Sequence, residues 1–193
     1  PRSTLFPYTT LFRSEMDILR EMHHCQVFRL LAQDLAGLQT IEKLSDHLTE
    51  LADSIVQETL PLVWTKIKKR HRETPRFAVI GYGKMGGKEL GYASDLDLVY
   101  LYDDDDQDAQ ENYTRLAQHL NTWLSSQTPA GILFETDLRL RPNGDAGLLA
   151  VTVDAFRDYQ LKHAWTWEHQ ALTRARFCAG DSEVGARFDS IRC

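Results

Sequence analysis

The chain has 193 residues, of which 42% are apolar and 26% are charged, a composition typical of one globular domain with a helical extension. No apolar run is long enough to cross a membrane, and the start lacks the basic and apolar regions of a secretory signal. We therefore expect a cytoplasmic protein without a membrane partner. The net charge of −6 argues against a nucleic-acid partner, which usually requires a basic surface. The three cysteines lack zinc-ligand spacing and are expected to be reduced.

The two ends of the sequence are unusual. Residues 1–14 (PRSTLFPYTTLFRS) have neither helical nor strand periodicity, and we predict that they are a non-native scar outside the fold. The last residues, DSIRC, carry no helix cap or turn signal, so we expect a fragment truncated at its C-terminus. Between the ends, we predict a helical lead-in over residues 15–72 and an α/β core over residues 73–193.

The lead-in has the periodicity of two packed helices. Apolar residues recur three to five positions apart within residues 19–31, and mostly three or four apart within residues 41–60. A break is expected at Ala36-Gly37, and Asp17 and Thr40 are the predicted N-caps. The basic, turn-prone residues 66–76 mark the boundary with the core.

The periodicity changes after Pro75, where a short apolar run closed by Gly81 indicates a buried strand. We predict strands at residues 77–80, 95–102 and 131–140, and helices at residues 108–126, 152–162 and 165–177. The four aspartates at residues 103–106 are expected to form a solvated loop, and Trp165 and Trp167 to pack in the core. The fold class is therefore α/β, with a mixed β-sheet flanked by helices behind the N-terminal helical lead-in.

The glycine-rich loop after the first strand allows two interpretations. Gly81, Gly83 and Gly86 match the G-x-G-x-x-G dinucleotide fingerprint, and Asp103 falls where a ribose-binding acid is expected. A parallel crossover, however, needs a dozen or more residues and usually a full helix. The interval between Gly86 and the next strand is too short for that helix, so we favour the second interpretation.

The second interpretation depends on Asp95 and Asp97, which project to the same side of a strand because they are two residues apart. Two adjacent carboxylates repel each other, and a magnesium ion relieves that repulsion while binding substrate phosphates. A short helix that opens at Gly86-Gly87 would direct its positive end at the same phosphates, and Lys84 and Lys88 would add charge. The candidate nucleotide-binding residues are Gly86, Gly87, Lys84, Ser94, Arg139 and Arg141.

A third carboxylate is expected from a neighbouring strand, in the segment FETDLRLRP. By alternation, Asp137, Arg139 and Arg141 fall on one face of this strand. Asp137 is the third predicted metal ligand and a candidate general base, and the arginines are candidates for phosphate contacts. A structural ladder of Asp137 with the arginines is the alternative.

The glycine pair, the paired aspartates and the later Asp137 resemble the DNA polymerase β-type nucleotidyltransferase superfamily. Three longer stretches closely resemble the glutamine synthetase adenylyltransferase family, and similarity covers the chain from about Glu15 to Arg176. The stretches are FAVIGYGKMGGKELGYASDLDLVYLYDD, ILFETDLRLRPNGDAGLL and YQLKHAWTWEHQALTRAR.

The resemblance implies a bifunctional enzyme with two related halves. One half transfers AMP from ATP to a tyrosine of glutamine synthetase, using two magnesium ions, and the other removes it by phosphorolysis. The GYGK and WTWEHQAL segments are more similar to the attaching, C-terminal half. The resemblance also implies Asp95, Asp97 and Asp137 as metal ligands, Gly86-Gly87 as the nucleotide-binding loop, and regulation by a PII signal protein. The removing half, another acceptor, and a nucleotide-sensing module without turnover are the open alternatives.

Overall fold

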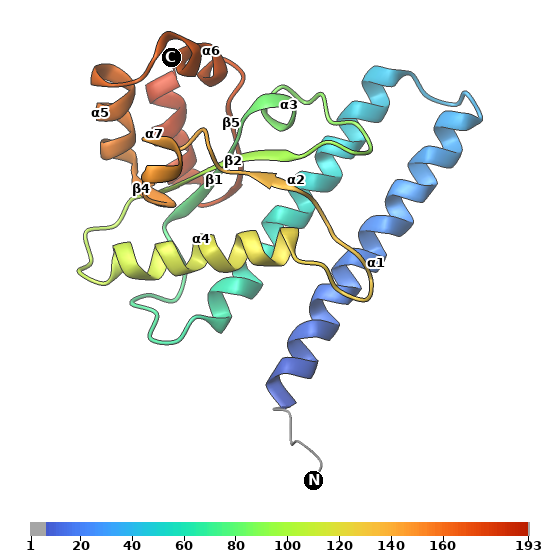
Figure 1. The fold of residues 1–193 in the computed structure, drawn as a ribbon, viewed down its shortest axis with the longest axis horizontal. Helices are drawn as coiled ribbons and strands as arrows, with labels where there is room; N and C mark the ends of the chain where they lie inside the picture. Colours follow the sequence, from blue (N-terminus) through green and yellow to red (C-terminus); the bar gives the residue numbers. More distant parts are fainter. Residues whose placement is uncertain (1–6, 193) are drawn as a thin grey trace.

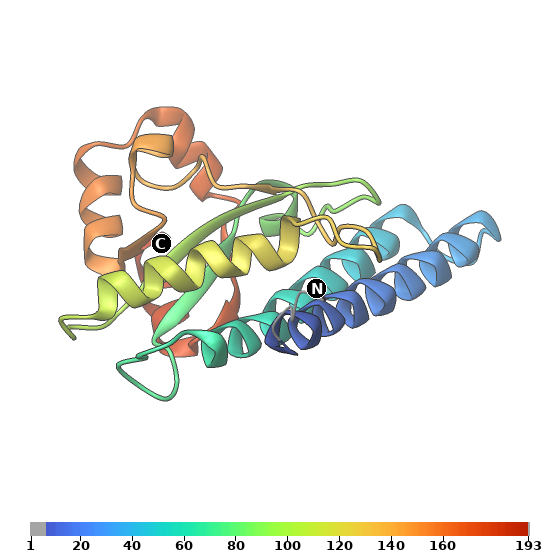
Figure 2. The ribbon, with the colours of Figure 1, turned by 60° about the horizontal axis from the view of Figure 1, so that its bottom comes forward.

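The computed structural model describes the backbone of residues 7–192 and the side chains of residues 15–192. Two long antiparallel helices extend away from a compact α/β core, and the second helix also packs against the sheet (Figures 1 and 2). Within the described residues, no helix has the length and apolar character that a membrane span requires.

The lead-in consists of α1 (Pro7–Leu35) and α2 (Ile41–Lys66). The break at Ala36-Gly37 is confirmed: Gly37 has a φ of +66°, a conformation that glycine adopts without strain. Thr40 caps α2 as predicted, because its hydroxyl accepts a hydrogen bond from the Lys43 N–H at 3.4 Å. Asp17 does not cap a helix, since α1 already begins at Pro7, inside the segment for which no periodicity was found. The non-native origin of residues 1–14 remains a prediction.

The mixed sheet contains five strands. They are β1 (Phe77–Gly81), β2 (Leu96–Tyr102), β3 (Thr136–Asp137), β4 (Ala150–Thr152) and β5 (Arg176–Gly180). The order is β3-β2-β1-β5. β3 pairs with the start of β2, at Leu96 and Asp97, and β4 pairs in parallel with the end of β2, at residues 100–102. β1 and β2 are antiparallel, with Phe77 opposite Tyr102. The dinucleotide-binding alternative requires parallel strands at this point, so the topology rules it out.

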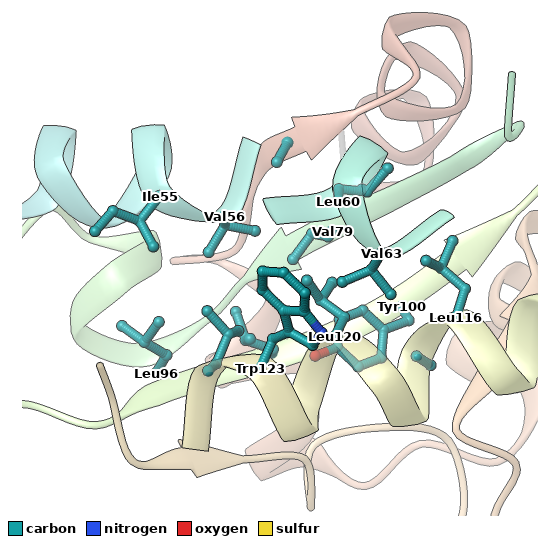
Figure 3. Close-up of a cluster of buried hydrophobic side chains, with 14 of the residues drawn as sticks. Ile55, Val56, Leu60, Val63, Val79, Leu96, Tyr100, Leu116, Leu120 and Trp123 are labelled. Atoms are coloured by element: carbon teal, nitrogen blue, oxygen red, sulfur yellow. The ribbon is translucent and has the colours of Figure 1, made fainter. Parts of the chain in front are cut away.

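The remaining helices are α3 (Gly83–Gly86), α4 (Ala109–Ser125), the 3₁₀ turn η1 (Gly144–Ala146), α5 (Val153–Lys162), α6 (Thr166–Leu172) and α7 (Ser182–Arg192). Alternating residues of β1 and β2 face two separate apolar clusters, as period-2 strands do. Val79 and Tyr100 join α2 and α4 on one face, and Ile80 and Leu101 join α5, α6 and α7 on the other. Figure 3 shows the first cluster, with Trp123 between the helices.

Two predicted elements differ from the structure by more than the position of their ends. The predicted strand at residues 131–140 is reduced to Thr136–Asp137, because Gly131 turns with a φ of +98° and Arg141 N–H bonds back to the Leu138 carbonyl. The predicted helix at residues 165–177 ends at Leu172, and β5 follows, paired with β1. The pairing partner lies far away in the sequence, so local periodicity could not reveal this strand.

The aspartates at residues 103–106 were expected to be solvated, and two of them are not. The Asp104 side chain is only 3% exposed and accepts hydrogen bonds from His71 at 2.8 Å and Tyr113 at 2.7 Å. Asp103 forms ion pairs with Arg76 and Arg187. These contacts join the boundary segment, β2, α4 and α7 at the end of the sheet remote from Asp95.

Candidate metal and nucleotide site

The three predicted carboxylates converge at one edge of the sheet. Asp95 immediately precedes β2, Asp97 is the second residue of β2, and Asp137 lies opposite Asp97 on the parallel strand β3. Each side chain offers an oxygen within 4.8 Å of the others. The prediction that a neighbouring strand brings Asp137 to the pair is confirmed, and three convergent carboxylate oxygens are a ligand set that suits a hard divalent cation.

The surroundings shift the pKa values of two acids in this cluster in opposite directions. Burial, and then repulsion from Asp95 and Asp137, raises the pKa of Asp97 above its ordinary value, against the opposing effect of Arg139 and Lys84. In contrast, hydrogen bonds from Arg139 lower the pKa of Asp137. Arg139 Nε lies 2.8 Å from Asp137 Oδ2, and the backbone N–H of Arg139 lies 2.8 Å from Oδ1. The excess negative charge around Asp97 is what a bound cation would neutralise.

Gly83 belongs to this site, although the sequence indicated it only as part of the rejected dinucleotide fingerprint. It has a φ of +52°, and a methyl group placed on it would lie 2.0 Å from Oδ2 of Asp97. Only glycine therefore lets the backbone of α3 lie directly against this carboxylate. The distance depends on how β1, α3 and β2 pack, so the motif spacing alone could not have assigned this role.

The helix predicted to open at Gly86-Gly87 instead ends there, since α3 spans Gly83–Gly86 with Gly87 as its C-cap. A methyl group on Gly86 would lie 2.1 Å from the Arg174 carbonyl oxygen, so this glycine permits close packing of α3 against the segment before β5. Lys84 is exposed on α3 and partly opposes the rise in the pKa of Asp97. Ser94 accepts a hydrogen bond from the Gly91 N–H at 2.9 Å and so shapes the turn before Asp95.

The two predicted arginines separate in the structure, because the strand ends at Asp137 and no alternation continues beyond it. Arg139 is 75% exposed and holds Asp137. Arg141 is largely buried, and its Nη1 donates to the Leu138 carbonyl at 2.7 Å. Both line a hollow of about 470 Å³ beside the acids, together with Asp95, Asp137 and Asp145.

The tryptophans of the WTWEHQAL segment were expected in the core, but both lie at the surface: Trp165 is 71% exposed and Trp167 is 54% exposed. Glu168 is the buried member of this segment. Its carboxylate accepts hydrogen bonds from the Trp165 N–H at 2.8 Å and the Tyr159 hydroxyl at 2.9 Å. This carboxylate caps α6 and links it to α5, a structural role.

Comparison with known proteins identifies the family of the chain. The profile of the family described as glutamate-ammonia ligase adenylyltransferase matches residues 7–191. The chain belongs to this family. Relatives in the family are named bifunctional glutamine synthetase adenylyltransferase/adenylyl-removing enzyme. The chain is 66% identical over 192 residues to the one from Aromatoleum aromaticum, an alignment that covers 100% of the chain and 20% of the relative.

Two further relatives with the same name give similar values. The enzyme from Nitrosomonas europaea is 61% identical over 186 residues, which are 96% of the chain and 20% of the relative. The enzyme from Neisseria meningitidis serogroup B is 63% identical over 179 residues, which are 93% of the chain and 20% of the relative. The chain thus spans about a fifth of the length of the adenylyltransferases that it matches.

Proposed function

We propose that this chain carries the adenylylating site of its family and transfers AMP from ATP to a tyrosine hydroxyl of glutamine synthetase, with release of pyrophosphate. The convergence of Asp95, Asp97 and Asp137 at one edge of the sheet is the observation that supports this proposal most directly. The modification would take place in the cytoplasm and regulate nitrogen assimilation. Regulation of the whole enzyme by a PII signal protein is proposed from the family resemblance alone.

In this proposal, Asp95 and Asp97 hold two magnesium ions and Asp137 holds one of them. Bound magnesium would supply positive charge that stabilises the entering and leaving oxygens of an in-line phosphoryl displacement. Asp137 is suited to accept the proton of the tyrosine hydroxyl, because its hydrogen bonds from Arg139 keep it ionised and oriented. Gly83 lets Asp97 lie close to α3, so the acids and the phosphate-binding loop share one rigid unit.

The phosphates of ATP are proposed to bind along α3 and the loops around it. The proposed nucleotide-binding residues are Gly86, Gly87, Lys84, Ser94, Arg139 and Arg141. Arg139 is exposed and pairs with Asp137 through Nε and Nη2, so its Nη1 can contact a phosphate while Asp137 stays held. Arg141 is held by main-chain carbonyls and would act by fixing the loop of residues 138–147. The hollow lined by Asp95, Asp137 and Arg139 is the space proposed for the part of the substrate that lies on the β3 side of the acids.

The deciding experiment is transfer of label from α-labelled ATP to unmodified glutamine synthetase in the presence of magnesium. The chain is compared with its Asp95→Asn, Asp97→Asn double variant, with the fold of both checked by circular dichroism. Label that appears with the chain and disappears with the variant is the expected result. Equal labelling by both would contradict the assignment of the acids.

The names of the relatives give specific support to a second candidate, the phosphorolytic removal of AMP from modified glutamine synthetase. The same three acids could serve that reaction, because phosphate would attack at the same phosphorus. The chain is therefore also incubated with adenylylated glutamine synthetase and phosphate. Release of ADP without any labelling of the unmodified protein would replace the first proposal with the second.

A further inference from the structure

Arg174 lies against the predicted phosphate-binding loop, although no sequence argument placed it in the site. It lies between α6 and β5, in the segment that passes beside α3 (Figure 1). A methyl group on Gly87 would lie 2.8 Å from Nη2 and 3.0 Å from Nε of Arg174. The planar guanidinium therefore covers the α-carbon of Gly87 directly.

The guanidinium and the metal-binding acids lie along the same short helix. The Gly87 N–H bonds to the Gly83 carbonyl at 3.0 Å, so these glycines are four residues apart on one helical turn. Positions i and i+4 lie on one face of a helix, and their β-carbon positions are about 5–6 Å apart. Asp97 lies against the first glycine and Arg174 against the second. A cationic group and a metal-binding carboxylate are thus about one helical turn apart, a spacing that a triphosphate chain can span.

The backbone around Arg174 is fixed, while its side chain can change partners. Ala175 is fully buried, and Arg176 donates hydrogen bonds to Asp53 at 2.9 Å and to the Met85 carbonyl at 3.1 Å. The Arg174 side chain is 47% exposed and pairs with Glu89, which is 61% exposed. Exposed ion pairs of this kind contribute little to stability, so exchanging Glu89 for another anion costs little.

From this geometry we infer that Arg174 binds phosphate oxygens of the nucleoside triphosphate, with Glu89 as its partner when the site holds no anion. The inference rests on the proposed function, because it needs a triphosphate beside Asp97. A guanidinium presents two parallel N–H donors to a phosphate group, a pairing that lysine cannot reproduce. Arg174 then forms the cationic end of a site whose other end is the acid cluster.

An ordinary surface ion pair would look similar in the structure, and the two roles predict different outcomes for Glu89. If the pair only holds the loop, loss of Glu89 and loss of Arg174 have the same effect. If Arg174 is a phosphate ligand, loss of the Glu89 charge frees it, and anion binding stays equal or becomes tighter. The matched control is Arg115, which is 46% exposed and pairs with Glu111 on α4.

The test measures binding of magnesium–ATP and of magnesium–tripolyphosphate by calorimetry, with melting temperatures to confirm folding. We compare the unaltered chain with Arg174→Ala, Arg174→Lys, Glu89→Gln and Arg115→Ala. We expect Arg174→Ala to weaken both ligands about tenfold or more, as the loss of a charged hydrogen-bonding pair implies. Arg174→Lys should recover part of the affinity, Glu89→Gln should bind at least as tightly as the unaltered chain, and Arg115→Ala should not change it.

Two results would overturn the inference while the proposed function stands: binding by Arg174→Ala within twofold of the unaltered chain, or equal losses in Arg174→Ala and Glu89→Gln. If the unaltered chain bound neither ligand, the proposed function would fail and the inference with it. Should Arg174→Ala prove unfolded, Arg174→Lys and Glu89→Gln decide between the two roles by the same comparison.

Discussion

Gly83 and Asp97 are in such close contact that a methyl group on the glycine would lie 2.0 Å from Oδ2 of the carboxylate. No β-carbon can be accommodated at that distance, and the φ of +52° at Gly83 adds about 1–2 kcal/mol of strain for any other residue. We therefore expect Gly83→Ala to displace Asp97 and to reduce AMP transfer about a hundredfold, the effect of a displacement of about 1 Å at a reacting centre. The measurement is the initial rate of label transfer.

The control for this prediction is Gly91→Ala. A methyl group on Gly91 would lie 3.7 Å from the Ser94 hydroxyl, an ordinary contact, and its φ is not in the left-handed region. Gly91→Ala should keep a rate within a few-fold of the parent. Equal losses in both variants would indicate that the loop is generally intolerant of side chains and would contradict a specific role for Gly83.

Asp97→Asn and Asp137→Asn should change stability in opposite directions when metal is removed with a chelator. The raised pKa of Asp97 means that folding disfavours its ionised form: its contribution is favourable below the unfolded pKa and is lost as pH rises through the folded pKa. At pH 7, Asp97→Asn should therefore stabilise the chain by about 1 kcal/mol, the repulsion of two unit charges a few ångström apart in water. The lowered pKa of Asp137 predicts that Asp137→Asn destabilises it.

The measurement is the free energy of unfolding from urea titration at pH 7, with chelator and then with excess magnesium. Magnesium should stabilise the unaltered chain by mass action and should stabilise neither variant to the same extent. If Asp97→Asn were destabilising with chelator present, burial and repulsion together could not be disfavouring the ionised form of Asp97.

The three acids show which parts of the candidate site could be predicted from the sequence. Asp95 and Asp97 were predicted from local strand periodicity, and Asp137 from the alternation in a segment expected to supply a third carboxylate. The contact of Gly83 with Asp97 and that of Arg174 with Gly87 depend on packing between separate elements. Motif spacing carries no information about such contacts, so they became visible only in the structure.

The same limit explains the errors in the fold. Residues 176–180 continue an apolar pattern that a helix could also show, and their pairing with β1 decides for a strand. Asp104 belongs to an acidic run that is typical of solvated loops, but its partner His71 is 33 positions away and only tertiary structure brings them together. Long-range pairing, rather than local propensity, determined both outcomes.

Asp104→Asn should be strongly destabilising because it removes a buried charge that His71 and Tyr113 contact. Burial raises the pKa of Asp104, but hydrogen bonds from His71 and Tyr113, aided by Arg72, outweigh burial and lower it. Removing one partner from such a buried network lowers the free energy of unfolding by about 3 kcal/mol. Urea titration at pH 7 measures the loss, and Asp105→Asn, at the exposed neighbour, should change stability by less than about 0.5 kcal/mol.

The pH dependence gives this prediction a second readout. A carboxylate with a lowered folded pKa contributes stability above its unfolded pKa, near 4, and this contribution is lost as pH falls through the folded value. The difference between the unaltered chain and Asp104→Asn should therefore be full at pH 6 and shrink below about pH 4. A difference that stayed constant down to pH 3 would show that the ionised carboxylate is not the source of the stability.

Residues 73–193 alone should not fold, even though the sequence suggested a boundary before them. Ten residues of α2 are buried, and Ile55, Val56 and Val63 share one apolar cluster with Val79 of the sheet (Figure 3). Each large apolar side chain that loses its burial removes about 1.5–3 kcal/mol, and the sum over this helix is comparable with the 5–15 kcal/mol by which a whole domain is usually stable. The measurement is cooperative urea unfolding of residues 73–193 beside residues 15–193. The longer piece, which retains α2, should unfold cooperatively, and a cooperative transition in the shorter one would show that α2 belongs to a separate domain.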